Sequence, residues 1–496
     1  MCPALSRRCF LKTTAAGVAS TSALFNLADD LFALFPAPDL HLKTKIRVGK
    51  VYLGVAQPGW PMSKLDLAAE VRRYEKELAR MPGLEDIEFV DGGLVSTAEQ
   101  AVAAKDKFQD VSGILALHLS LRTSPMMQAL MDSRQPLMIY TQPYSGHEWH
   151  VVASWQREGR LVDVLPSSRF EDIAEAVRSF RALQRLRETR ILHVNQRDAD
   201  AKYVQAIKDK FGTEIISIRL PELEEAYKQA DLAEAGADAK RWMREARKIV
   251  EPKKEDVLKG SLMYIAMRDL LAKYRAQAIT MNCLGMGLID RNMGYPCLGF
   301  VRFNNQLLAG VCEADLKSTM TQLIFTYLVG RTGFVTDPMF DQSNSTIIHA
   351  HCVAATQMEG PATKPAPYHI RTHLEDNRGV SLMVKMPIGR QVSMARLIGT
   401  DLMLFSTGDA VDSPMVERGC RSKLTMQVAN MDRFLHQWSS GLHRVIFYGD
   451  HSRDITRFCR FTQTRLVHEG VDDLTKEGTL DWLPRVHAQA GNASRS

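Results

Sequence analysis

Apolar and polar residues follow two rhythms along the first part of the chain. Short apolar runs are typical of buried strands, and apolar positions spaced three and four residues apart are typical of helices. Strands are predicted at Ile46–Val55, Ile87–Val90, Gly113–Leu117 and Pro136–Tyr140, with helices at Leu65–Met81, Thr97–Phe108 and Pro125–Met131 between them. This alternation indicates a doubly wound, mostly parallel sheet, and we place the first α/β domain at residues 45–150.

The same rhythm returns in a second α/β domain, placed at residues 165–360. Helices are predicted at Phe170–Leu186, Ala199–Phe211 and Lys254–Tyr274, and strands at Arg190–Val194, Glu214–Ile218, Ala278–Asn282 and Leu307–Val311. A long charged stretch over 221–252 carries its charges at helical spacing. Such charges favour a helix with a solvated face.

The pattern changes after residue 365, where short alternating segments are separated by Gly, Pro, Asn and Asp. Strands are expected at Tyr368–Thr372, Val380–Lys385, Val392–Ile398, Asp401–Thr407, Lys423–Val428 and Arg444–Tyr448. They predict a mainly antiparallel, barrel-like β domain over 365–470, followed by a tail at 471–496. The predicted fold class is therefore α/β, with two doubly wound Rossmann-like domains and a C-terminal β domain.

Composition narrows the class of protein. The chain has 496 residues, of which 45% are hydrophobic and 24% charged, which suits several globular cores. Its formal net charge of +6 is small for this length, and no basic stripe is interleaved with aromatics, so we expect no nucleic-acid partner. The eight cysteines contain no C-x-x-C pair. Four lie between residues 283 and 352, where small buried hydrophobes are favoured over a cysteine-rich metal site.

The first residues resemble an export signal, with a chance Arg-Arg pair as the alternative. Ser6-Arg7-Arg8-Cys9-Phe10-Leu11-Lys12 resembles the twin-arginine motif, and Thr13–Phe25 supplies a weakly hydrophobic segment. We assign residues 1–37 to this signal and a linker, and expect the twin-arginine machinery to export the chain to the periplasm or another extracytoplasmic site. The apolar stretch is too short and too polar for a permanent membrane span.

The segment from Gly310 to Glu359 concentrates candidate chemistry. Acids and imidazoles stand there in a mostly apolar, neutral context, namely Glu313, Asp315, Asp337, Asp341, His349 and His351. Burying such groups is costly unless they are paired, and a divalent metal commonly supplies the pairing. Glu313 follows a predicted strand, where α/β sheets bind ligands.

Five of these residues also have a purely structural interpretation. Asp315 stands where a helix N-cap belongs, which favours capping over catalysis. Asp337 and Asp341 fit turns, with Asp341 the weaker ligand candidate. His349 and His351 share one face of an extended run and are metal ligands or hydrogen-bonded core residues. Two later histidines, His443 and His451, flank the last predicted strand and are further candidates.

The pattern in this region resembles the L-fucose/L-arabinose isomerase superfamily, and its fucose isomerase-like branch most closely. The resemblance is carried by Pro296-Cys297, Cys312-Glu313-Ala314-Asp315, Phe334-x-x-Asp337, His349-Ala350-His351-Cys352, Gly419-Cys420-Arg421, and His443 with Tyr448-Gly449-Asp450. Two α/β domains and a β-rich domain also match that family's layout. Thr336 stands where arabinose isomerases place a glutamate, so the fucose-type aspartate fits better.

The resemblance implies a divalent-metal-dependent aldose–ketose isomerase acting on a pentose, hexose or deoxy sugar through an enediol. Glu313 and Asp337 would be the metal-binding acid–base pair, with His443 and His351 as further ligands. Mixed carboxylate and imidazole ligands suit Mn²⁺, or Mg²⁺ or Co²⁺. Family sites often form between subunits, so a homo-oligomer is expected.

Two other classes of function stay open. Paired α/β domains also build exported, non-catalytic sugar-binding proteins, and export motifs often accompany redox enzymes. A dinucleotide site is disfavoured, because Leu284-Gly285-Met286-Gly287 lacks the third glycine of G-x-G-x-x-G. Trp149, at the end of the first domain, is a candidate for stacking on the sugar, with a core tryptophan as the alternative.

Overall fold

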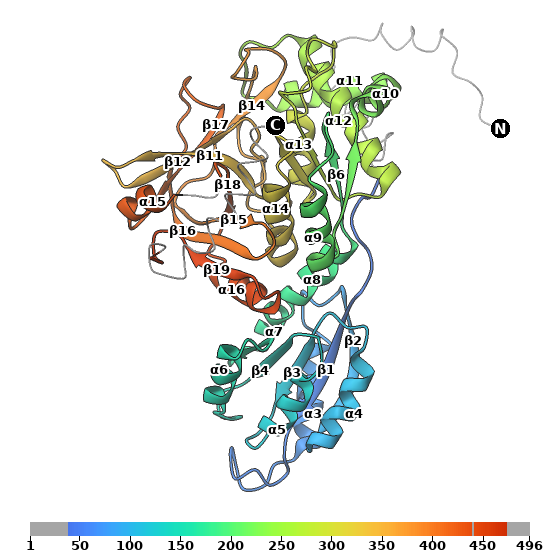
Figure 1. Ribbon diagram of the computed structural model, residues 1–496, viewed down its shortest axis with the longest axis vertical. Coiled ribbons are helices and arrows are strands. Elements are labelled where there is room, and N and C mark those ends of the chain that lie inside the picture. The colour runs from blue at the N-terminus through green and yellow to red at the C-terminus, as the bar shows by residue number, and fades with distance from the viewer. Residues whose placement is uncertain (1–37, 439–440, 474–496) are drawn as a thin grey trace, which may run out of the picture.

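The computed structural model describes residues 38–438 and 441–473, so the export motif and most of the predicted tail lie outside the described residues. In Figure 1 the first sheet lies in the lower body and the later sheets in the upper body. The first sheet is fully parallel, in the order β2-β1-β3-β4-β5. Its strands are β1 (Ile46–Leu53), β2 (Ile87–Val95), β3 (Ile114–His118), β4 (Leu137–Thr141) and β5 (Val162–Pro166).

Helices connect these strands as the alternation predicted. They are α3 (Leu67–Leu78), α4 (Ala98–Lys105) with the short η1 (Asp106–Phe108), α5 (Ser124–Met131) and α6 (Trp149–Arg157). The sheet continues past the predicted boundary at residue 150, because β5 pairs with β4. The predicted helix over 170–186 is divided into α7 (Asp172–Ala176) and α8 (Arg178–Glu188).

The second sheet is also parallel, in the order β10-β9-β6-β7. It comprises β6 (Arg190–Val194), β7 (Glu214–Ile218), β9 (Ala278–Met281) and β10 (Ala309–Cys312). Helices α12 (Lys254–Tyr274) and α13 (Cys297–Asn305) pack on one face, and α8, α9 (Ala201–Phe211) and α14 (Leu316–Val329) pack on the other. Both faces are therefore covered, which explains the continuous apolar runs of these strands.

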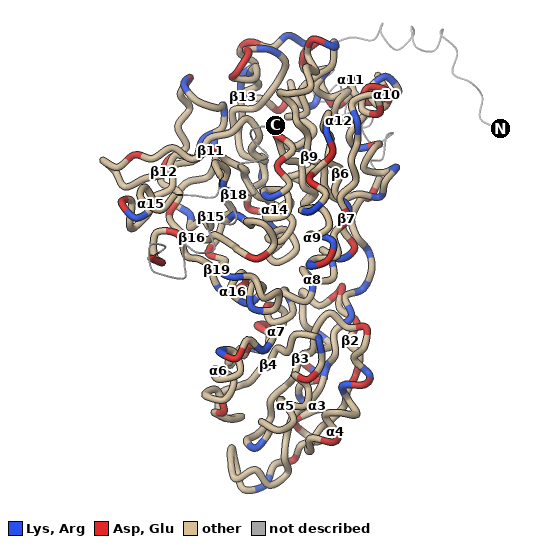
Figure 2. Tube along the Cα trace, viewed as in Figure 1, with Lys and Arg blue, Asp and Glu red and all other residues tan. Residues whose placement is uncertain are grey.

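The charged stretch over 221–252 forms α10 (Leu220–Gln229), α11 (Leu232–Glu245) and the short strand β8 (Lys248–Ile249). Figure 2 shows acidic and basic residues interspersed along the chain. Not all of the charged side chains on α11 face solvent. Glu234 and Asp238 are buried, paired with Arg268 on α12 and Arg302 on α13. The prediction of a wholly solvated face is wrong at these two positions, because helical charge spacing does not reveal buried arginine partners.

The antiparallel sheet contains β11 (Phe334–Asp341), β12 (Thr346–His351), β15 (Arg390–Ile398), β16 (Leu402–Asp412), β17 (Ser422–Gln427), β18 (Arg444–Tyr448) and β19 (Arg465–His468). Its order is β15-β18-β11-β12-β17-β16-β19, and an additional β15–β16 pairing closes six strands into a ring. Residues 334–351 were placed in the second α/β domain, with Asp337 in a turn. Instead they form β11 and β12 of this sheet, because β11 pairs with β18, and Asp337 lies within β11. The fold is thus mixed α/β, with two parallel sheets and one mostly antiparallel sheet.

Smaller elements complete the upper body and tie it to the first sheet. A three-stranded sheet has the order β14 (Ser381–Val384), β13 (Tyr368–Arg371) and β8. Helix α15 (Met431–Gln437) precedes β18, and α16 (Ser452–Phe461) follows it. From α16, Arg460 reaches Asp163 of β5 at 2.6 Å, and Phe461 stacks on Phe180 of α8. Among the described residues, every helix is too short or too polar to cross a bilayer.

Candidate metal centre

The first side chain of the candidate centre stands at the carboxyl end of β10. After the buried strand ends at Cys312, Glu313 and Ala314 both adopt left-handed backbone conformations, with φ of 65° and 52°. Non-glycine residues pay roughly 1–2 kcal/mol each for this conformation. The turn directs the chain into α14 and leaves the Glu313 side chain 41% exposed, so solvent reaches this carboxylate.

Asp315 begins α14 and does more than cap it. Its Oδ1 accepts hydrogen bonds from the backbone N–H groups of Lys317 and Ser318, as the sequence predicted. Its Oδ2 also lies 3.0 Å from Arg396 Nη1 and 2.8 Å from His443 Nδ1. Burial acts to raise the Asp315 pKa, but the charge of Arg396 and the contact with His443 outweigh it and hold the pKa well below its usual range.

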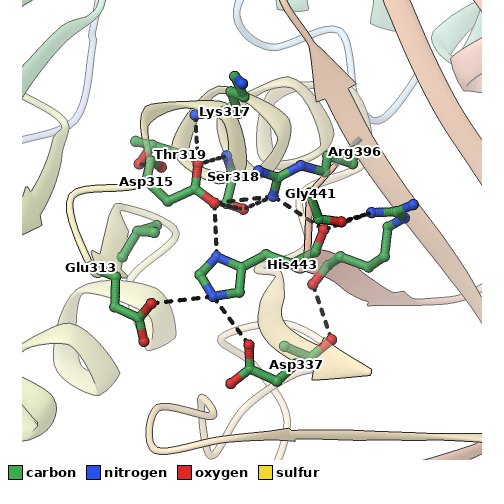
Figure 3. A network of polar contacts seen from close by, with 12 residues as sticks. Glu313, Asp315, Lys317, Ser318, Thr319, Asp337, Arg396, Gly441 and His443 are labelled. Atoms are coloured by element: carbon green, nitrogen blue, oxygen red, sulfur yellow. Dashed lines mark hydrogen bonds and ion pairs between the residues drawn. The ribbon is translucent and has the colours of Figure 1, made fainter. Parts of the chain in front are cut away.

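Strand pairing explains why His443 meets Asp337, which is remote in sequence. Strands β11 and β18 are antiparallel, and Thr336 pairs with Arg444. The next residue of β11 and the residue before β18 therefore meet, and His443 Nε2 lies 3.3 Å from Asp337 Oδ1 and 3.5 Å from Glu313 Oε2. Figure 3 shows the imidazole of His443 between the carboxylates of Glu313, Asp315 and Asp337.

His351 enters from β12, the other neighbour of β11. Ala350 pairs with Asp337, which brings the end of β12 beside the same carboxylates. The Nε2 of His351 lies 3.5 Å from Glu313 Oε1, and its ring meets the His443 ring edge-on at 5.6 Å between centroids. The four predicted ligands thus converge from two strands, one turn and the residue before a third strand, namely Asp337, His351, Glu313 and His443.

The acids and imidazoles shift one another's titration. Interactions with His351 and then His443 lower the pKa of Glu313 to about 2. Burial acts to lower the pKa of His443, but its bond to Asp315 and its contacts with Asp337 and Glu313 raise it to about 11. Burial likewise opposes the contacts of His351 with Cys352 and Glu313, which raise its pKa to about 10.

Three other candidates take structural positions. His349 lies with its Nδ1 2.9 Å from Thr336 Oγ1, and burial lowers its pKa to about 3. Asp341 accepts from the backbone N–H of Ser343 in an exposed turn. His451 contacts the carbonyl of Tyr448 through Nε2, at 2.9 Å.

Trp149 lies apart from this centre, on α6 in the lower body. Its ring packs edge-on against His118 at 5.4 Å between centroids. It also lines a cavity of about 580 Å³ together with Gln142 and Arg453. Within one chain, the structure therefore separates the predicted sugar-stacking residue from the predicted metal ligands.

The convergent residues fit a divalent cation. Asp337 Oδ1 and His351 Nε2 are both buried and accept or donate no hydrogen bond among the described residues. Ligand atoms of Glu313, His351 and His443 all lie within 4.8 Å of one another, so the group could hold a metal ion. The His443 Nδ1 contact with Asp315 is the carboxylate–histidine arrangement that orients metal ligands.

One part of this environment was not predicted, and a second was predicted only as buried hydrophobic residues. Arg396, on β15, donates to Asp315, to Ser318 and to the carbonyl of His443, and only the folded ring brings it there. Cysteines 283, 297, 312 and 352 gather beside His351, although their clustering in sequence was a visible signal. Comparison with protein-family models finds no match for this chain, and comparison with curated proteins finds none either.

Proposed function

We propose that the chain is a divalent-metal-dependent aldose–ketose isomerase that acts on a pentose, hexose or deoxy sugar through an enediol. The observation that carries the proposal is the convergence of Glu313 and Asp337 on His443 Nε2, at 3.5 and 3.3 Å. These are the residues to which the fucose isomerase-like resemblance gives metal-binding and acid–base roles. Interconverting an aldose and a ketose needs two such groups, because protons move both at carbon and at oxygen.

The two carboxylates differ in ways that suit separate proton transfers. Glu313 is 41% exposed on a turn, whereas the side chain of Asp337 is 29% exposed and is fixed on β11. Glu313 is therefore the more solvent-accessible carboxylate of the two. Each positioned acid or base is worth roughly 10²–10⁴-fold in rate. We assign Glu313 and Asp337 as this pair.

A bound Mn²⁺, or Mg²⁺ or Co²⁺, would polarise the sugar oxygens and stabilise developing negative charge. Glu313, Asp337, His443 and His351 would hold it, since their donor atoms are oxygen and imidazole nitrogen. Asp315 would fix the His443 ring so that Nε2 faces the ion. Arg396 balances the negative charge of Asp315.

The remaining expectations concern the setting of the reaction. The twin-arginine-like motif supports export, and that machinery carries folded proteins, so the ion would be bound before transport. A homo-oligomer would allow Trp149 of the lower body to stack on a sugar in a neighbouring subunit's centre. The exported, non-catalytic sugar-binding protein is the competing function.

Proton exchange in D₂O decides between the two functions. Metal-free protein is reloaded with Mn²⁺ and incubated with pentoses, hexoses and 6-deoxy sugars, and deuterium at C1 and C2 is followed by NMR. An isomerase incorporates deuterium into at least one sugar, and Glu313→Gln slows this about 10²-fold or more. The matched control Asp341→Asn, outside the centre, leaves the rate unchanged. Sugar binding without deuterium incorporation would establish the binding protein instead.

A further inference from the structure

A second group of metal-binding side chains lies directly behind His351. Four buried cysteines come together there from different elements, namely Cys283 after β9, Cys297 at the start of α13, Cys312 at the end of β10 and Cys352 after β12. The thiol of Cys352 lies 3.9 Å from that of Cys312 and within 4.8 Å of that of Cys297.

The separation of two of these sulfurs suits a common metal ion. Cys312 Sγ and Cys352 Sγ are 3.9 Å apart, too far for a disulfide. Two thiolates on a tetrahedral zinc, each ~2.3 Å from the ion, stand roughly 3.8 Å apart. The sulfur–sulfur distance is thus that of one edge of a zinc tetrahedron rather than that of a covalent bond.

His373, which follows β13, supplies an imidazole to the same group. It is buried, and ligand atoms of His373, Cys297 and Cys352 all lie within 4.8 Å of one another. Its Nδ1 lies 2.7 Å from Oε2 of Glu375 as an ion-pair contact, and neither ring nitrogen has a hydrogen-bond partner among the described residues. A carboxylate on one ring nitrogen and a free second nitrogen are the arrangement of a metal-ligating histidine.

We propose that Cys297, Cys352 and His373 form a Zn²⁺ site. Cys312 lies 3.9 Å from Cys352 but groups with Cys352 and His351 rather than with Cys297 and His373, so its side chain moves toward the ion to complete the tetrahedron. Thiolate and imidazole ligands favour zinc, whereas the carboxylate-containing centre favours harder ions, so the chain holds two adjacent sites of different preference. The zinc site does not depend on the proposed isomerase function. Because Cys352 Sγ lies 3.5 Å from His351 Nδ1, bound zinc fixes the end of β12 from which His351 reaches Glu313.

Zinc content of the full chain, purified with reductant and supplied with zinc, tests the site. Wild type retains zinc after dialysis, and Cys297→Ser and His373→Gln lose it. The control Cys459→Ser changes a buried thiol in a separate core and retains the metal. Glu375→Gln weakens zinc affinity about 10–100-fold. Glu417→Gln, which removes the same charge from a side chain that faces Arg371, leaves the affinity unchanged.

Two measurements on wild type need no variant to fold. A mercurial that caps thiols releases the zinc in step with thiol modification, and the Co²⁺-loaded protein shows thiolate-to-cobalt charge-transfer absorption. Absence of that absorption would overturn the proposal. So would zinc that survives in Cys297→Ser and His373→Gln but is lost in Glu313→Gln, or a Cys312–Cys352 disulfide in the freshly purified protein.

Discussion

Asp315→Asn separates the helix-capping role of this side chain from its role as a buried charge. Asparagine caps helices about as well as aspartate, so the N–H groups of Lys317 and Ser318 stay satisfied. The charge that faces Arg396 and His443 is lost. These two partners have side-chain exposures of 7% and 9%, and Asp315 itself has 12%, so water replaces little of the interaction.

Losing one partner of a buried ion pair costs about 3 kcal/mol or more of unfolding free energy. The control is Asp231→Asn, because Asp231 caps α11 through the same two kinds of backbone contact and is exposed. That control should change the unfolding free energy by less than about 0.5 kcal/mol. Urea unfolding of metal-free protein, followed by circular dichroism near neutral pH, measures both changes.

The sign of the pH dependence gives a second check. The folded-state pKa of Asp315 is held below its ordinary value, so its stabilisation is complete above about pH 4 and is lost as the pH falls further. The stability gap between wild type and Asp315→Asn should therefore narrow in acid. Mn²⁺ affinity should fall about 10–100-fold in the variant, because Asp315 orients His443. Equal unfolding shifts for Asp315→Asn and Asp231→Asn would refute this reasoning.

Three further outcomes are expected. Mn²⁺ affinity should rise with pH, up to about tenfold per pH unit for each proton released, because the pKa values of His351 and His443 are raised to about 10 and 11. Calorimetry in two buffers measures the protons released on binding. Binding without proton release would contradict the assignment of these histidines as metal ligands. Burial acts to raise the pKa of Glu148, but hydrogen bonds outweigh it and lower the pKa to about 2. Glu148→Gln should therefore reduce the unfolding free energy by about 2 kcal/mol near neutral pH and leave it unchanged near pH 2. An equal loss of unfolding free energy in acid would contradict this prediction. Arg444→Met should cost about 3–5 kcal/mol in urea unfolding, because Arg444 pairs with buried Glu469 at 2.7 Å; an unchanged midpoint would show that the pair adds nothing.

The elements of the fold were largely predictable because their patterns are local. Strands β1, β3, β4, β6 and β7 and helices α3, α5, α9 and α12 lie within a few residues of their predicted positions. Strand β5 was missed because Val162-Asp163-Val164 is short and carries an acid that pairs with Arg460 of α16. The sheet to which β11 and β12 belong was also missed. Their apolar pattern identifies a strand but not its partner.

The residues of the candidate centre were predictable, but the buried side chains that contact them were not. Glu313, Asp337 and His351 stand out because charged or titratable groups interrupt apolar runs, and His443 was linked to them through the family resemblance. Arg396 gave no such signal, because an arginine in an alternating strand is ordinarily solvent-facing. Its burial against Asp315 follows from the closed ring of strands, which no local pattern encodes.

The pairing of Thr336 with Arg444 has a consequence for how the chain folds. A slip of one residue between β11 and β18 would carry Asp337 away from His443 and turn every side chain of one strand to the opposite face. An ion held by Glu313, Asp337 and His443 would stabilise only the correct register. At a hundredfold excess over its dissociation constant, it would add about 2.7 kcal/mol to the unfolding free energy of that register. Metal available during synthesis would then favour the ring of strands with the correct register over forms in which β11 and β18 pair out of register. This selection would occur before the protein meets any sugar.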